Sequence, residues 1–171
     1  SLTLLNVTLD YGYIDSNAGG TIYNAGTLNL VNTTISNGHS ATAGGAIYNL
    51  ETLNITNSTF YNNFATNGGG AVYNDGSTVT IITSNFSINA SSSDGGAVVG
   101  NLGTVNITSS TFTGNVASRG GAIFVPQFGT VHVNGSTLNS NAASSGGGIN
   151  NFGTLNVTNS TFTDNMASSK G

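Results

Sequence analysis

Side chains that could carry out chemistry are few in this chain. Its 171 residues include six acidic side chains, two histidines, two cations and no cysteine. Cleavage of a polysaccharide would require two carboxylates on one face, or carboxylates beside a cation or a metal ion. The acids follow no common spacing and stand at Asp10, Asp15, Glu51, Asp75, Asp94 and Asp164. We therefore predict no catalytic residue and no enzymatic activity.

The candidates for metal or phosphate chemistry are equally isolated. His39 and His132 are far apart in the sequence and no thiolate is available, so we predict no metal site and no cofactor. Both histidines, with Arg119 and Lys170, are expected to be solvated surface side chains. Glycine runs such as residues 68–70 precede no Lys-Ser/Thr pair, so they do not predict a phosphate-binding loop.

The composition excludes several classes of partner. Charged residues make up 5% of the chain, against about 25% in a typical globular protein. Two cations are too few for nucleic acid or an anionic membrane, because both require clustered positive charge. No apolar run is long enough for a transmembrane segment. The many Gly, Asn, Ser and Thr residues disfavour helices and favour extended backbone.

A repeat of about 25 residues runs through the whole chain. Paired glycines followed by a small residue and then Ile or Val recur at steps of 25 or 26 residues, at Gly19, Gly44, Gly69, Gly95, Gly120 and Gly146. Repeats of this length are typical of solenoids, in which neighbouring copies bury a shared core.

Each copy contains three short segments in which apolar and polar residues alternate, as they do in half-buried strands. In the second copy they are the glycine segment 44–49, the Thr-Leu-Asn-Ile segment 52–55 and the Ser-Thr-Phe segment 58–60. The glycine segments supply one inward column of Ile and Val, and the Thr segments supply two more. The third segment supplies the column Ile35, Phe60, Phe86, Phe112, Leu138 and Phe162.

These columns predict an all-β fold, a right-handed parallel β-helix (β-solenoid) of six to seven coils with three strands per coil. Residues 1–171 are expected to form a single β-helix repeat domain. Neither end carries a polar capping segment, so we expect a fragment of a longer rod or a unit that stacks head to tail.

A further polar signature is an Asn three residues after the Phe, or after Leu138, that ends the third segment. We expect these side chains to form a ladder at a turn, each amide bonding its equivalent one coil away, with the Asn residues tolerating left-handed backbone. The members are Asn63, Asn89, Asn115, Asn141 and Asn165.

The Gly-Gly-Ala-Ile/Val motif at Gly44, Gly69, Gly95 and Gly120, with Phe-x-x-Asn at Phe60, resembles the repeats of chlamydial polymorphic outer membrane proteins. The consensus sequence of the repeat is also similar to that of large secreted β-helix proteins of environmental bacteria. The chlamydial family comprises autotransporter adhesins with a β-helical passenger domain. The resemblance therefore implies an extracellular or cell-surface location.

The outward positions of the Thr segments form two polar ladders. A flat array of Thr at the strand spacing of ~4.8 Å resembles the surface of ice-binding β-helices and is a candidate interaction face. Its members are Thr27, Asn29, Thr52, Asn54, Thr78, Thr80, Thr104, Asn106, Thr130, His132, Thr154 and Asn156.

The chain also contains ten Asn-x-Ser/Thr sequons, the acceptor motif for N-linked glycans. They are at Asn6, Asn32, Asn54, Asn57, Asn85, Asn89, Asn106, Asn134, Asn156 and Asn159.

These observations favour an extracellular structural or adhesive rod, as a passenger-type segment or an end-to-end fibre subunit. Two alternatives remain open, namely an ice-binding β-helix that uses the Thr ladder and a carbohydrate-binding or carbohydrate-active β-helix. The expected partners are other copies of the chain, or a receptor or glycan on a host or other surface.

Overall fold

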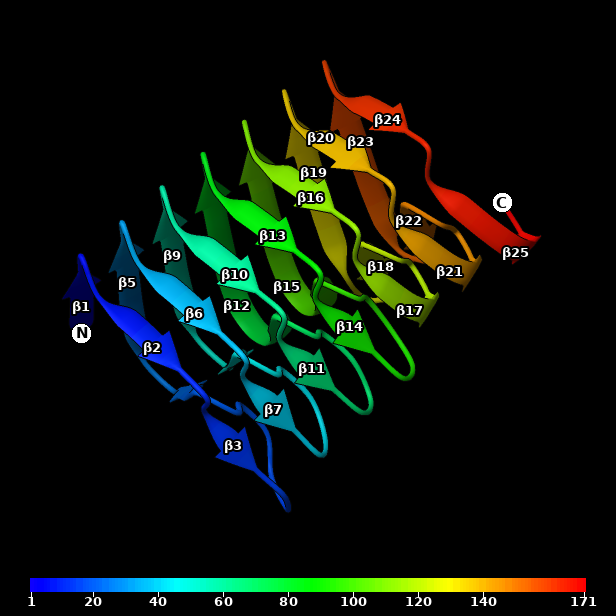
Figure 1. Ribbon diagram of the computed structural model, residues 1–171. Coiled ribbons are helices and arrows are strands. Elements are labelled where there is room, and N and C mark those ends of the chain that lie inside the picture. The colour runs from blue at the N-terminus through cyan, green and yellow to red at the C-terminus, as the bar shows by residue number, and fades with distance from the viewer.

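Strands are the only regular elements of the computed structural model, which describes residues 1–171 (Figure 1). They stack as parallel sheets into a β-solenoid of about six turns, with about 26 residues and three strands per turn. In Figure 1 the chain rises on the far side, descends on the near side and advances away from its N-terminus, which is a right-handed winding. The predicted fold is confirmed.

Three sheets run the length of the solenoid. The long sheet contains β1 (Leu2–Leu5), β4 (Ile22–Asn24), β5 (Thr27–Val31), β8 (Ile47–Asn49), β9 (Thr52–Thr56), β12 (Val72–Ile82), β15 (Val98–Thr108), β18 (Ile123–Val125), β19 (Thr130–Asn134), β22 (Ile149–Asn151) and β23 (Thr154–Thr158). The Phe sheet contains β2 (Thr8–Asp10), β6 (Thr34–Ser36), β10 (Thr59–Tyr61), β13 (Asn85–Ser87), β16 (Thr111–Thr113), β20 (Thr137–Asn139) and β24 (Thr161–Thr163). The third sheet contains β3 (Tyr13–Ile14), β7 (His39–Ser40), β11 (Phe64–Ala65), β14 (Ala90–Ser91), β17 (Val116–Arg119), β21 (Ala142–Ser145) and β25 (Met166–Lys170).

The sheets are divided differently from the expectation. The glycine and Thr segments were expected to form separate sheets, but β12 and β15 run through both, so the two segments share the long sheet. The third sheet instead begins just after the Asn ladder, where only a turn was predicted. Strands as short as Phe64–Ala65 are too brief to show any alternation in the sequence.

The core follows the predicted columns. Val72 pairs with Ile47 on one side and with Val98 on the other, and Phe86 pairs with Phe60 and Phe112. The three Phe side chains are fully buried, and their rings stack with centroids 4.6 and 4.8 Å apart. Equivalent side chains of the same type therefore contact one another in successive coils.

The predicted Asn ladder exists and is buried. Asn89 Nδ2 donates to Asn115 Oδ1 at 3.0 Å and to the carbonyl of Phe60 at 3.0 Å. Asn89 Oδ1 accepts from both the backbone N–H and the Nδ2 of Asn63. The left-handed backbone lies one residue earlier than expected, as at Ile88 with φ of 56°. The Asn side chains thus hydrogen-bond neighbouring coils to one another, and the residue before each Asn adopts the left-handed conformation of the turn.

Two further polar ladders were not predicted. Asn24 Nδ2 donates to Asn49 Oδ1 at 2.6 Å, and Asn49 Nδ2 donates to Asn74 Oδ1 at 2.8 Å. At the turn before the Phe sheet, one backbone N–H donates to the hydroxyl of a Ser in the next coil. For example, the Ser58 N–H donates to Ser84 Oγ at 3.0 Å. The bonds to the Ser hydroxyls satisfy buried backbone N–H groups that no strand pairs.

The two glycines of each pair have different roles. Gly69 has φ of 61°, a conformation that favours glycine. Gly70 does not, but a Cβ at Gly70 would lie 2.1 Å from the carbonyl oxygen of Gly96 in the next coil. The first glycine is therefore required by the turn and the second by the close approach of two coils.

Candidate functional site

The Thr and Asn positions singled out in the sequence lie on the outer face of the long sheet. Strand pairing aligns Thr104 with Thr78 and Thr130, and Asn106 with Thr80 and His132. This polar face consists of Thr27, Asn29, Thr52, Asn54, Thr78, Thr80, Thr104, Asn106, Thr130, His132, Thr154 and Asn156. Its hydroxyl and amide groups can offer hydrogen bonds at one-coil intervals.

Some of this polar face is already hydrogen-bonded. Asn54 Nδ2 donates to Asn29 Oδ1 at 2.9 Å, and Asn29 Nδ2 donates to Thr3 Oγ1 at 3.3 Å. A third outward column borders the face and includes Ile82, which is 39% exposed. The face therefore contains no Asp, Glu, Lys or Arg, but it is not uniform in chemistry.

His39 is not the freely solvated side chain that was expected. It lies in β7 and stacks between Tyr13, with ring centroids 5.1 Å apart, and Phe64, at 5.2 Å. Strand pairing places the three rings in one column of the third sheet. The imidazole thus fills a step in an aromatic ladder, whereas His132 lies on the polar face.

Arg119 is also more than a solubilising side chain. Its Nε and Nη2 donate to Asp94 Oδ1 and Oδ2 at 2.7 and 2.8 Å, which makes a bidentate ion pair. Its guanidinium carbon lies 4.6 Å from the ring centroid of Phe124, within the range of a cation–π interaction. The planar guanidinium is consequently fixed by both a carboxylate and an aromatic face.

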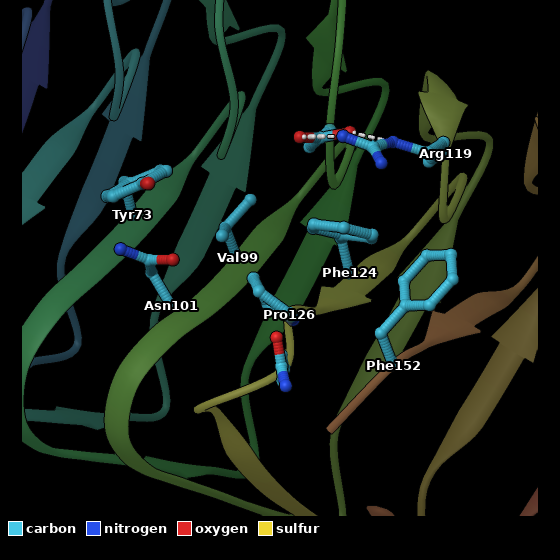
Figure 2. A pocket seen from close by; sticks show the side chains of 9 residues that line it. Tyr73, Val99, Asn101, Arg119, Phe124, Pro126 and Phe152 are labelled. Carbon is cyan, nitrogen blue, oxygen red and sulfur yellow. Dashed lines mark hydrogen bonds and ion pairs between the residues drawn. The ribbon is translucent and has the colours of Figure 1, made fainter. Parts of the chain in front are cut away.

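This ion pair borders a hollow of about 540 Å³ (Figure 2). In Figure 2, Val99 and Phe124 lie between Tyr73 and Phe152, which stand at the two ends. The remaining lining residues are Asp94, Asn101, Arg119, Pro126 and Gln127. The hollow therefore combines aromatic surface with amide and ion-pair groups.

Asp75 has hydrogen-bond partners near this hollow. It accepts from Tyr48 Oη at 2.5 Å and from Asn101 Nδ2 at 2.6 Å. Partial burial, followed by the bond to Asp75, raises the pKa of Tyr48 above its usual value. Burial and the charges of Asp75 and Asp94 also raise the pKa of Tyr73. The raised pKa values favour the neutral form of both phenols, and the Tyr48 hydroxyl donates to Asp75.

The remaining titratable groups stay apart. No three His, Asp or Glu side chains gather to form a possible metal site. The chain contains no helix that could span a membrane. The local chemistry near Asp94 is that of an ion pair beside the buried ring of Phe124, the half-exposed ring of Tyr73 and the exposed ring of Phe152.

The sequons differ in accessibility. Asn89 is fully buried, and its amide is engaged in the Asn ladder, so it cannot accept a glycan in the folded chain. The sequence had placed this residue both among the possible glycan acceptors and in the Asn ladder, and the structure shows it in the ladder. The other nine sequon Asn residues are exposed or half-exposed, namely Asn6, Asn32, Asn54, Asn57, Asn85, Asn106, Asn134, Asn156 and Asn159.

The pairing of Asp94 with Arg119 was missed, although the sequence carries its signal. Each residue directly precedes a glycine pair, and they are 25 positions apart, which is one repeat. Residues at the same position in successive repeats meet across neighbouring strands, and the structure pairs these two as a β-bridge. Comparing charges column by column would have found the pair.

Comparison with known proteins identifies the repeat. Residues 57–75 and 109–126 match the family model of the Chlamydia polymorphic membrane protein repeat. Each matched segment contains the Phe strand, the following turn and the glycine segment of the next coil. The resemblance predicted from the sequence is confirmed for these two repeats. No curated protein and no solved structure matches the chain.

Proposed function

From the repeat that it shares with chlamydial polymorphic membrane proteins, we propose that the chain is a surface-exposed, extracellular β-solenoid rod that acts in adhesion. The observation that carries this proposal is the match of two separate coils to that repeat, within a solenoid whose other coils have the same ladders. The proposed role is structural and involves binding, with no catalytic step.

The construction of the coils suits such a role. Along the sides of the rod, strand backbones pair with the next coil, so a partner meets side chains rather than free backbone groups. The polar face and the sheet opposite it carry few charges, which leaves hydrogen bonding and shape as the basis of recognition. Adding coils lengthens the rod without changing its cross-section.

Adhesion can be tested with beads coated with the purified chain and applied to cultured epithelial cells. We expect the beads to attach more than albumin-coated beads, and soluble chain to compete. The variant Thr104→Lys/Asn106→Lys alters the polar face, and Ser87→Lys/Thr113→Lys places the same charges on the outer face of the Phe sheet. Attachment no greater than that of albumin-coated beads would refute the proposal.

Ice binding remains a second candidate because Thr27, Thr52, Thr78, Thr104, Thr130 and Thr154 give one outward Thr in each coil. The neighbouring column varies between Asn, Thr and His, which interrupts the regular array. Thermal hysteresis of a freezing solution would support this function. Its loss in Thr104→Lys, with retention in Thr113→Lys, would assign the activity to the polar face.

A further inference from the structure

Three hollows on the rod share lining residues. Tyr73 lines both the hollow of Figure 2 and a neighbouring hollow of about 360 Å³, which also contains Tyr23 and Tyr48. Arg119 and Phe152 line both the hollow of Figure 2 and a third hollow of about 470 Å³ toward the C-terminus. We call the three hollows together the axial groove, because the residues that they share follow one another from coil to coil.

The floor of the axial groove is a column of outward side chains on the long sheet. Strand pairing aligns Tyr23 with Tyr48, Tyr48 with Tyr73, Tyr73 with Val99, and Val99 with Phe124. The three Tyr rings stack with centroids 5.5 Å apart. The three Tyr side chains are exposed or half-exposed, whereas Val99 and Phe124 are 1% and 5% exposed. A ligand lying along the rod therefore meets the Tyr rings and, toward the C-terminus, the ring of Phe152, which is 61% exposed.

The walls supply fixed polar groups. On one side stands the Asp94–Arg119 ion pair, and Arg119 Nη1 donates to no protein group. On the other side, Asn101 Nδ2 donates to Asp75 Oδ1, and Gln127 also lines the hollow. Because the ion pair and Asn101 are already oriented, a ligand would lose little free energy in ordering them.

The chemistry of the groove points to one occupant. We propose that the axial groove binds a linear, uncharged polysaccharide with its chain parallel to the rod axis. Sugar rings present flat C–H faces to aromatic side chains and hydroxyls at their edges to amide, carboxylate and guanidinium groups. One coil rises by ~4.8 Å, a length comparable with one hexose unit in an extended chain.

Two other occupants fit less well. An acidic polysaccharide would need unpaired cations, but Arg119 is already neutralised by Asp94, and Asp75 lies close by. An extended peptide would normally add to a free sheet edge, yet the strands flanking the groove pair with neighbouring coils. A neutral sugar chain requires neither a free cation nor an open edge. This inference goes beyond adhesion because it names a class of ligand and the groove that binds it, and its test uses soluble sugars without cells.

The test is isothermal titration calorimetry of the purified chain with neutral hexasaccharides of glucose, mannose and xylose, and with hexagalacturonate as the acidic comparison. Phe152 is 61% exposed at the end of the Figure 2 hollow, and Phe128 is 76% exposed outside its lining. Phe152→Ala and Phe128→Ala are thus matched variants with little risk to the fold. Circular dichroism of both variants checks that the fold is retained.

We expect at least one neutral hexasaccharide to bind more tightly than its disaccharide. Phe152→Ala should weaken that binding about tenfold, as truncation of an aromatic contact residue does, and Phe128→Ala should leave it unchanged. Arg119→Lys should also weaken binding, because Lys cannot make the bidentate, ring-stacked arrangement. Absence of binding to every neutral probe, preference for hexagalacturonate, or equal loss in both Phe variants would overturn the proposal.

Discussion

Buried polar residues define how one coil sits on the next. Asn89 uses both its amide hydrogens and its carbonyl oxygen, and connects three coils through Phe60, Asn63 and Asn115. Ser84 likewise bonds to the coil before it and to its own chain two residues earlier. Fully satisfied networks of this kind stabilise a unique packing, whereas a missing partner leaves several buried groups unpaired.

The Asn ladder can be tested by Asn89→Ala. This change leaves the Asn63 N–H and the Phe60 carbonyl without side-chain partners, so we expect the free energy of unfolding to fall by about 2–4 kcal/mol. Asn85→Ala is the matched control, because Asn85 is an exposed sequon residue four positions earlier. It should change stability by less than about 0.5 kcal/mol. Urea unfolding measures the stability of both variants, and equal effects would contradict the role of Asn89 in linking neighbouring coils.

The glycine pair allows a second test. Gly70→Ala places a Cβ against the Gly96 carbonyl and should separate two coils, at a cost of about 3 kcal/mol or more. Gly26→Ala meets no atom within 4 Å and should leave stability unchanged or raise it by about 0.4–1 kcal/mol. Thermal unfolding of the two variants distinguishes these outcomes. A tolerated Gly70→Ala would show that the coils can move apart there without cost.

At the scale of elements, each strand is stabilised by equivalent strands in the coils on either side. Isolated strands of three residues such as β16 have no independent stability, but the column of Phe rings gives each one a buried contact above and below. A residue within the stack should therefore contribute more than the same residue in a terminal coil.

Phe112→Ala and Phe162→Ala compare these positions directly. Phe112 is fully buried, and its loss should cost about 3–5 kcal/mol, as large-to-small changes in a core do. Phe162 occupies the same column in the last coil but is 45% exposed, so its replacement should cost clearly less. Urea unfolding gives both values, and a loss below ~1 kcal/mol for Phe112→Ala would contradict the observed packing.

The outer Tyr column makes stability depend on alkaline pH. The raised pKa values of Tyr48 and Tyr73 mean that the folded chain holds these phenols neutral where the unfolded chain begins to ionise them. Their contribution is complete below pH ~10 and is lost as the pH rises further. Urea unfolding above pH ~10 should show a steeper loss of stability in the wild type than in Tyr48→Phe. Identical slopes would contradict the proposed effect of burial and of Asp75.

The elements that the sequence predicted are those in which one residue type repeats. The Ile, Leu and Phe columns were readable because each recurs once per period, and their register was confirmed. Two-residue strands such as β14 leave no alternation, so the third sheet was missed. The Asp94–Arg119 pair was missed because its members appear once each, and only their shared place before a glycine pair connects them. The axial groove could not be predicted from the sequence, because it depends on where the fold places the outward column of Tyr rings and Phe124 relative to the turns on either side of it.

At the scale of the whole molecule, the solenoid has two different end surfaces. Figure 1 shows the N- and C-termini at opposite ends of the stack of strands. In the last coil, positions that are buried elsewhere are open, since Val157 is 37% exposed and its equivalent Ile107 is 1% exposed. The first strand, β1, likewise has one strand neighbour, β5.

The isolated 171-residue chain should therefore associate end to end. Contact between the last coil of one copy and the first coil of another would bury Val157 and Phe162 and pair the free edges of β24 and β2. Because the two surfaces differ, this contact is head to tail and repeats into an open fibre. Phe162→Lys should prevent association by placing a charge in the contact, whereas Thr163→Lys puts the same charge at the neighbouring, outward-facing position. Sedimentation velocity over a range of concentrations should show growth for the wild type and Thr163→Lys, and monomers for Phe162→Lys. A wild-type chain that stays monomeric at high concentration would show that the exposed coils do not self-associate.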